Sequence, residues 1–243
     1  MNFKKILPHI IAVVAFIVVS LVFFSPVMEG KKLFQSDMAQ FDGASKELHD
    51  YEKASGEGAN WANAMFSGMP SYQIAFPQSN NIFNTIAPPL TLWNRSFDAG
   101  IFFIMMLGFY VFMCSMGAKP LLSMIAALAY ALGSYNIIII AVGHITKAWA
   151  MAMIAPILGG MILVFRRKWL AGAVMFTLSL GLQIGFNHIQ ITYYTMLAAF
   201  ILGLCYLIYA IKEKTIKDFA LGGGMLVLCA AIAFLPNSSH FKL

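Results

Sequence analysis

The chain has 243 residues, of which 60% are hydrophobic and only 11% are charged. A soluble domain usually carries about a quarter charged residues, so this composition excludes an ordinary soluble protein. Sixteen Lys and Arg against ten Asp and Glu give a net charge of +6. Because the basic residues cluster where apolar runs end, we interpret the excess as a membrane orientation signal, and we expect no nucleic-acid partner.

The apolar residues fall in blocks long enough for helices that cross a bilayer, which need about 20 residues. We therefore expect an all-α, polytopic membrane helix bundle of about seven spans. A basic start followed by an apolar run resembles a signal peptide, but the run is long and no small-x-small cleavage site follows, so we expect an uncleaved first span. The predicted spans are 6–28, 99–117, 120–142, 148–165, 169–187, 190–211 and 219–236.

Small residues and cysteines within the spans have simple interpretations. Glycines such as Gly108, "GGM" at 159–161 and "GGGM" at 222–225 permit close helix approach. The three cysteines, Cys114, Cys205 and Cys229, all lie in predicted spans and show no metal-binding spacing. We read each as a small apolar residue and expect no disulfide framework.

The basic residues predict the orientation of the bundle. Placing Lys4 and Lys5 in the cytoplasm puts Lys119, the run 166–168 and the lysines of 212–217 on the same side. The short opposite loops, around 142–147 and 187–190, hold only Lys147. This asymmetry follows the positive-inside rule, so we expect residues 29–98 to form a long extracytoplasmic loop.

The first part of that loop, from Ser36 to about Lys53, favours a helix. Phe34, Phe41 and Leu48 are spaced by seven, which predicts an amphipathic helix on the membrane surface. The charged residues of 46–53 alternate in sign, a pattern typical of a solvated face.

Asp37, at the start of this helix, has two interpretations. With Gln40 three residues later it resembles a capping box, in which Asp37 is the helix N-cap. Alternatively, its carboxylate is a catalytic base or a ligand of a divalent cation at the membrane face. Asp42 is the second candidate acid, but a separation of five residues turns it about 140° away on a helix, so the two do not form a carboxylate pair.

Three cationic or titratable residues are candidates for binding a phosphate. His144 and Lys147 lie three apart at the junction of two predicted spans, where a Lys can hold a lipid phosphate as a point charge. The alternative is a snorkelling Lys beside an interfacial His. Arg95 is the third candidate, with Asp98 three residues later as its possible ion-pair partner.

A second polar island follows in "GLQIGFNHIQITYY", residues 181–194. Polar side chains at this depth usually face a bundle interior or a water-filled cavity, so we list Gln183, Asn187, His188 and Gln190 as pocket residues. The alternative is hydrogen bonding between helices and a short loop. The predicted topology places this island on the same side as Asp37 and His144, which indicates a polar pocket at the non-cytoplasmic mouth of the bundle.

Four motifs in order resemble the bacterial YfhO family of large membrane proteins: "LFQSDMAQFDGASKEL", "WANAMFSGMPSYQI", "GHITKAWAMAMIAPILGG" and "NHIQITYY". The resemblance covers nearly the whole chain. That family belongs to the GT-C class of glycosyltransferases, which are multispan helical enzymes that use a lipid-phosphate-linked sugar donor. Their first outer loop carries an acidic residue that serves as catalytic base or metal ligand, and Asp37 occupies that place here, with Asp42 as the alternative.

The resemblance implies a GT-C-like multi-pass protein of the bacterial cytoplasmic membrane. It would transfer a sugar from a polyprenyl-phosphate donor to a cell-envelope polymer or lipid outside that membrane. YfhO-like proteins are several times longer, so we expect residues 1–243 to be a single transmembrane domain and a fragment of a larger protein. Two other functions stay open: a lipid or polysaccharide transporter or flippase, and a non-catalytic membrane protein fragment.

Overall fold

The computed structural model describes residues 3–31, 33–71, 74, 82–92 and 98–241 and is all-α apart from one pair of two-residue strands. The first long helix is α1 (Phe3–Phe23), and it is followed by α2 (Ser25–Met28) and α3 (Ser36–Ser55). The strands β1 (Trp61–Ala62) and β2 (Met69–Pro70) pair antiparallel, with Trp61 opposite Pro70. The remaining elements are α4 (Ile82–Leu90), α5 (Asp98–Met116), α6 (Pro120–Ala131), α7 (Ser134–Val142), α8 (Ile145–Phe165), α9 (Trp169–Gly185), α10 (Ile189–Lys212), α11 (Ile216–Phe234) and the 3₁₀ helix η2 (Leu235–Phe241).

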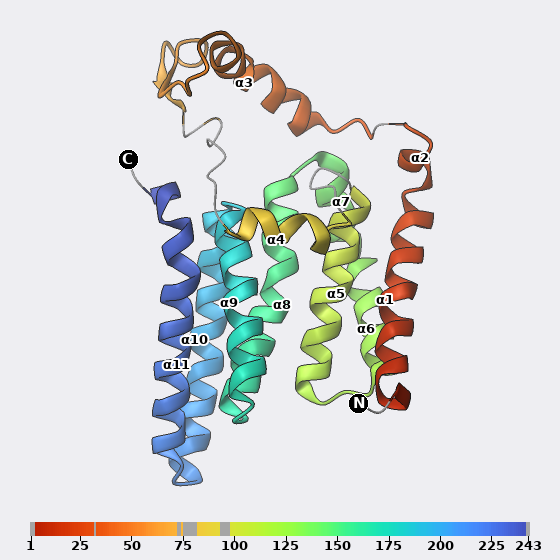
Figure 1. Cartoon of the computed structure of the whole chain (residues 1–243), viewed down its shortest axis with the longest axis vertical. Helices are drawn as coiled ribbons and strands as arrows, with labels where there is room; N and C mark the ends of the chain where they lie inside the picture. The colour runs from red at the N-terminus through yellow and green to blue at the C-terminus, as the bar shows by residue number, and fades with distance from the viewer. Residues whose placement is uncertain (1–2, 32, 72–73, 75–81, 93–97, 242–243) are drawn as a thin grey trace.

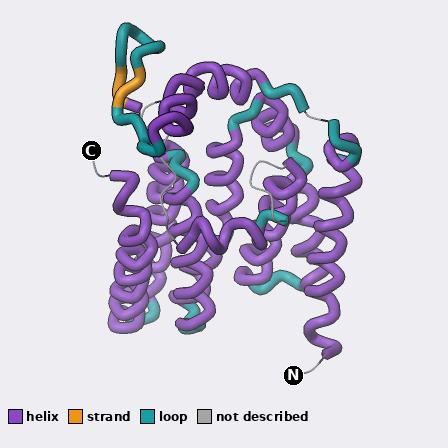
Figure 2. Tube along the Cα trace, turned by 45° about the horizontal axis from the view of Figure 1, so that its top comes forward, coloured by secondary structure: helices purple, strands orange, loops and turns teal. Residues whose placement is uncertain are grey.

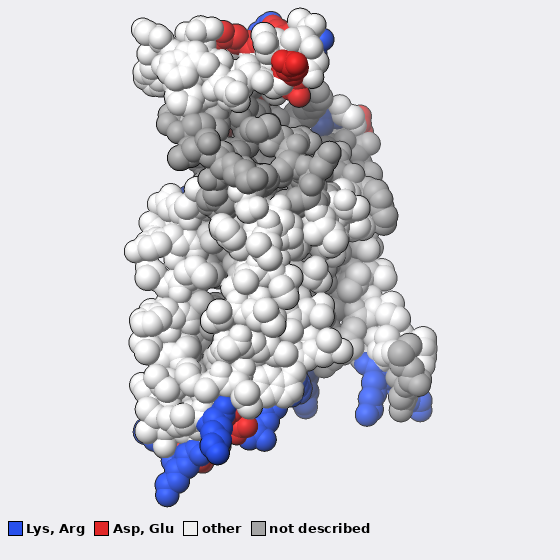
Figure 3. Space-filling model, turned by 60° about the vertical axis from the view of Figure 1, so that its left-hand side comes forward, with Lys and Arg blue, Asp and Glu red and all other residues white. Residues whose placement is uncertain are grey.

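The long helices lie side by side and run between two ends of the molecule (Figure 1). We call one the loop end: it carries α2, α3 and α4 and the turns at 143–144 and 186–188. We call the other the basic end: it carries the N-terminus and the turns at 117–119, 166–168 and 213–215. Figure 3 shows Lys and Arg side chains gathered at the basic end, as the basic residues of the sequence predict.

Five helices are long and apolar enough to cross a membrane, namely α1, α5, α8, α10 and α11 with its extension to Ser238. The predicted span 120–142 is two helices, α6 and α7, bent by 48° at Gly133, and it makes a sixth span if the pair crosses as one. The predicted fifth span, 169–187, corresponds to α9, which has only 17 residues and is therefore shorter than the other long helices. The first span is also shorter than predicted, because α1 ends at Phe23 and α2 is a separate turn of helix.

The core of the bundle is α5, α8 and α9, where small residues permit close packing. A Cβ atom at Gly160 would lie 2.7 Å from the backbone nitrogen of Phe176, and one at Gly108 would lie 2.6 Å from the carbonyl oxygen of Ala152. Such distances are too short for any side chain, so these glycines bring the helix backbones together. The prediction does not hold for the whole "GGGM" run, because Gly223 and Gly224 face open space.

The peripheral helices have little protein around them. Only 11% of the α10 span is buried, against 78% of the α8 span. The exposed residues of α10 are large and apolar, among them Phe200, Ile201 and Ile208. A helix with such a face needs a bilayer around it, so the burial pattern agrees with a multi-pass membrane protein.

The loop between α1 and α5 contains the predicted helix, but its start differs from the prediction. The N-cap of α3 is Gln35 and makes no side-chain cap hydrogen bond, so the capping-box interpretation of Asp37 is wrong. The helix ends at Gly56, whose left-handed backbone (φ +75°) suits glycine. Figure 2 shows α3 arching over the loop end, with the strand pair beyond it.

Glu47 attaches the residues that follow β1 to α3. The alternating charges of 46–53 had predicted that this side chain would face solvent. Its carboxylate accepts hydrogen bonds from the backbone N–H groups of Asn63 (3.0 Å) and Ala64 (2.8 Å) and from the Asn63 amide (3.0 Å). These bonds, that of Ala64 first, hold the pKa of Glu47 below its usual value. By contrast, Asp50 pairs with the exposed Lys46 one turn earlier on the same helix, as on a solvated face.

Candidate functional site

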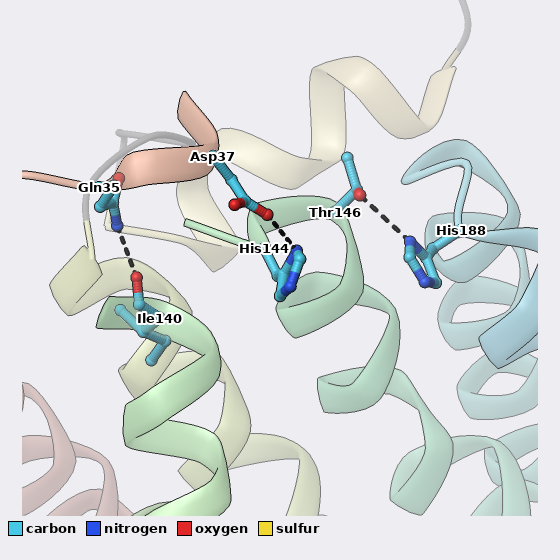
Figure 4. A network of polar contacts seen from close by, with 6 residues as sticks. All are labelled: Gln35, Asp37, Ile140, His144, Thr146 and His188. Carbon is cyan, nitrogen blue, oxygen red and sulfur yellow. Dashed lines mark hydrogen bonds and ion pairs between the residues drawn. The ribbon is translucent and has the colours of Figure 1, made fainter. Parts of the chain in front are cut away.

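The loop end brings together polar side chains from α3, the turn before α8 and the turn before α10 (Figure 4). We call Gln35, Asp37, His144, Thr146 and His188 the rim cluster. The turn after α7 positions His144 in this cluster. The C-cap of α7 is Gly143, which has a left-handed conformation (φ +96°). The turn then reverses the chain and leaves His144 as the first residue before α8, facing the start of α3.

The closest contact of the rim cluster joins two candidate residues. Oδ2 of Asp37 lies 2.7 Å from Nδ1 of His144, and 35% of the aspartate and 46% of the histidine side chain stay exposed. The contact uses one carboxylate oxygen and one ring nitrogen. It therefore orients both groups while each remains reachable from solvent, an arrangement suited to proton transfer.

Gln35 attaches the start of α3 to the bundle. Its Nε2 donates to the carbonyl oxygen of Ile140 at 2.7 Å and to Oδ1 of Asp98 at 3.1 Å. Asp98 is the first residue of α5 and is only 5% exposed. Because Gln35 reaches both α5 and α7, Asp37 two residues later has a defined position at the mouth of the bundle.

His188 lies at the other side of the cluster. Its Nδ1 is 3.3 Å from Oγ1 of Thr146, so it contacts the first turn of α8. Burial, followed by the charges of Lys147 and His144, lowers the pKa of His188 below its usual value. The neutral imidazole is therefore favoured at neutral pH. His188 and Asn187 also line a cavity of about 240 Å³ with residues of the first two turns of α10.

Lys147 adds a cation beside the cluster. Its Nζ lies 5.4 Å from the centroid of the Tyr135 ring, a cation–π distance. In the described part of the chain no carboxylate forms an ion pair with this ammonium group. Lys147 therefore retains N–H donors that are available to an anion.

Other candidate residues lie apart from the cluster. Asp42 is exposed and has no hydrogen-bond or ion-pair partner among the described residues. Gln190 is exposed and donates to the hydroxyl of Tyr194 at 2.9 Å, one turn along α10. Arg95 lies outside the described residues, and so does any contact between it and Asp98.

Gln183 is a residue of the bundle interior. It is fully buried, and its Nε2 donates to the carbonyl oxygen of Ala150 (2.8 Å) and to Oγ1 of Thr195 (3.0 Å). These contacts join α9 to α8 and α10. Gln183 therefore forms hydrogen bonds between helices, which was the alternative to its predicted place in a pocket. Asn187 and His188, by contrast, line a cavity.

The described residues do not form a metal site. Among them, no group of three or more His, Cys, Asp or Glu side chains is placed to hold an ion. The carboxylate of Asp98 accepts a hydrogen bond from Gln35. The described residues thus fit a proton-transfer pair better than a divalent-cation site.

The sequence analysis did not identify two members of the rim cluster, Gln35 and Thr146, or Tyr135, the aromatic partner of Lys147. Gln35 and Thr146 each lie two residues from a candidate, Asp37 and His144, so their polarity inside apolar surroundings was a usable signal. Tyr135 had no such signal, because its contact with Lys147 depends on the bend between α6 and α7.

No protein-family model matches this sequence, and no curated protein or solved structure matches it.

Proposed function

We propose that this chain is a membrane glycosyltransferase of the GT-C class that resembles the YfhO family. In this proposal the basic end faces the cytoplasm and the loop end faces the cell envelope. The rim cluster is the active site, the donor is a polyprenyl-phosphate-linked sugar, and the acceptor is a hydroxyl of an envelope polymer or lipid. The proposal is supported chiefly by the Asp37–His144 contact at the mouth of the bundle.

Asp37 is the general base. His144 holds Oδ2, which leaves Oδ1 to accept the proton of the acceptor hydroxyl. The acceptor oxygen then forms a bond to the anomeric carbon of the sugar. The bond between that carbon and the phosphate oxygen breaks, and its electron pair leaves with the polyprenyl phosphate.

Lys147 stabilises the leaving phosphate. Negative charge develops on that group in the transition state, where a fixed cation lowers the barrier most. The position of Lys147 supports this role in two ways. Its charge contributes to the lowered pKa of His188, and it lies three residues after His144, which contacts Asp37. Arg95 is a second candidate for the same phosphate, by its place in the sequence.

The proposal is tested by Asp37→Asn in membranes of cells that express the protein. The variant keeps the shape of the side chain but cannot accept a proton, so we expect transfer from a labelled polyprenyl-phosphate sugar to fall by about 10²-fold or more. Glu52→Gln, an exposed acid on the same helix, is the matched control and is expected to keep the wild-type rate.

Asp42→Asn separates the two candidate acids. A loss of transfer in Asp42→Asn with none in Asp37→Asn would move the base to Asp42. Wild-type transfer in both variants, at equal membrane expression, would reject the proposal. Movement of the labelled lipid across vesicles without transfer of its sugar would favour the transporter instead.

A further inference from the structure

A cavity lies at the basic end, at the opposite end of the bundle from the rim cluster. It has a volume of about 640 Å³ and is enclosed by the end of α8, the turn at 166–168, the last turns of α10 and the first turn of α11. Cys205 also lines the cavity. It lies about two turns before the end of α10, so it is separated from that end by about 10 Å along the helix axis. The cavity therefore extends from the polar turns into the apolar part of the bundle.

Three aromatic rings form its apolar wall. Phe165 stacks on Tyr206, with ring centroids 4.6 Å apart, and on Phe219, with centroids 5.3 Å apart and planes only 4° from parallel. The three rings come from α8, α10 and α11. A wall assembled from three helices is set by the fold and offers a continuous surface to hydrocarbon.

Two arginines, Arg166 and Arg167, line the cavity at the turn that follows α8. Nη1 of Arg166 donates to the carbonyl oxygens of Ser115 (2.9 Å) and Met116 (3.0 Å) at the end of α5. These bonds fix the side chain, and its remaining N–H groups have no partner among the described residues. Arg167 forms an ion pair with Asp218 of α11, and 61% of its side chain stays exposed.

Cations greatly exceed anions at this end. The described residues there include nine Lys and Arg, at positions 4, 5, 119, 166–168, 212, 214 and 217, against Glu213 and Asp218. Figure 3 shows these blue side chains extending from the lower end of the molecule. The positive-inside rule places this end in the cytoplasmic leaflet, which carries anionic lipids.

We propose that this cavity binds one anionic phospholipid of the leaflet at the basic end. The phosphate pairs with the guanidinium group of Arg167 at the turn after α8, and the first methylenes of an acyl chain lie on the wall formed by Phe165, Tyr206 and Phe219. Basic pockets between membrane helices bind anionic headgroups in this way, and a soluble phosphate would leave the aromatic wall uncovered. The phosphate competes with Asp218 for Arg167, since an exposed ion pair is weak.

Two turns at the basic end contain a basic residue with a left-handed backbone, where substitution by glycine removes a charge and keeps the turn. Arg167 has a left-handed backbone (φ +62°), which glycine adopts more readily than arginine. Lys214, in the neighbouring turn between α10 and α11, has φ +56° but does not line the cavity. Arg167→Gly and Lys214→Gly therefore remove the same charge with the same backbone benefit, and only the first should affect the cavity.

The test uses the purified chain in a zwitterionic detergent, with native mass spectrometry to count bound lipids. We expect phosphatidylglycerol to be retained in preference to phosphatidylcholine with the same acyl chains. Arg167→Gly should weaken retention about fivefold, the effect of one basic residue near a headgroup. Asp218→Asn should strengthen it, because the competing carboxylate is gone, and Lys214→Gly should leave it unchanged. Equal losses in Arg167→Gly and Lys214→Gly would show surface attraction only and would overturn the proposal.

Cys205 gives a second readout, because it is exposed and lines the cavity. Bound phosphatidylglycerol should slow its labelling by a maleimide, measured by peptide mass spectrometry, and phosphatidylcholine should not. Glycerol 3-phosphate is the headgroup without acyl chains and should protect Cys205 poorly. Equal protection by glycerol 3-phosphate would indicate an anion site without lipid, and no protection by phosphatidylglycerol would place the lipid elsewhere; either result contradicts the proposal.

Discussion

Gly143 and Gly117 have nearly the same backbone, with φ of +96° and +95°, but they lie in turns at opposite ends of the bundle. A Cβ atom at Gly143 would lie 2.9 Å from Cβ of Gln35 and 3.1 Å from Cγ of Met38. A Cβ atom at Gly117 would meet only the Arg166 guanidinium, at 4.0 Å. The loop end is therefore covered by a second layer of chain, whereas the basic end is open to solvent.

This difference extends to the polar contacts of the two ends. At the loop end, side chains join elements remote in sequence, such as Gln35 and Ile140, which are 105 residues apart. At the basic end, short turns join neighbouring helices, and Arg167 forms an ion pair with Asp218. The comparison suggests that the loop end is built for defined geometry and the basic end for net positive charge.

The largest expected effect is the difference between Gly143→Ala and Gly117→Ala. A left-handed alanine costs about 1–2 kcal/mol in either turn. At Gly143 the methyl group also overlaps α3, which adds about 1–3 kcal/mol or displaces that helix. Thermal unfolding in detergent, with hydrogen exchange of the α3 amides, measures both effects. Equal destabilisation by the two substitutions would show that α3 does not rest on Gly143.

The next effect is local to the loop end. Glu47→Gln removes a carboxylate that accepts three hydrogen bonds, so we expect faster hydrogen exchange at the Asn63 and Ala64 amides. Because its pKa is lowered in the fold, the contribution of Glu47 is present above its usual pKa of 4.5 and is lost as pH falls below that value. Glu52→Gln on the same helix is the control, and equal exchange in both variants would contradict the assignment.

A smaller effect concerns the titration of His188, followed by NMR. Its pKa should lie below the usual 6.5, and the stability that its neutral form contributes should be lost as pH falls below 6.5. Lys147→Gln removes one of the positive charges and should raise the pKa in part, since burial remains. Lys168→Gln at the basic end should leave it unchanged. A pKa that does not respond to Lys147→Gln would place this ammonium group farther from the rim cluster.

The smallest effect is expected for the ion pair at the basic end. A double-mutant cycle with Arg167→Gln and Asp218→Asn should give a coupling below about 1 kcal/mol, because both groups are exposed and solvent screens them. A coupling above about 2 kcal/mol would mean that the basic end also depends on specific side-chain pairs, and the contrast between the two ends would disappear.

Much of the fold was predictable because its signals are local. The apolar runs predicted the helices of the bundle, and composition with the spacing of apolar residues predicted a helix over 36–53, close to the observed Ser36–Ser55 of α3. The bend between α6 and α7 and the early end of α9 were not predicted. Hydropathy gives the length of an apolar run, but it does not show where a helix inside that run bends or ends. The candidate site was predictable only as a gathering of polar residues at one end.

The length of an apolar run and the position of basic residues beside it can both be read from neighbouring residues in the sequence. The sequence by itself therefore determined a multi-pass helical bundle with one basic end. The partners of each polar side chain depend on how distant elements pack. Only the tertiary structure placed Asp37 against His144, put Gln183 in the interior and left Asp42 exposed. Close packing of Gln35 and Met38 against Gly143 sets where the start of α3 meets the bundle, and so decides the contact between Asp37 and His144.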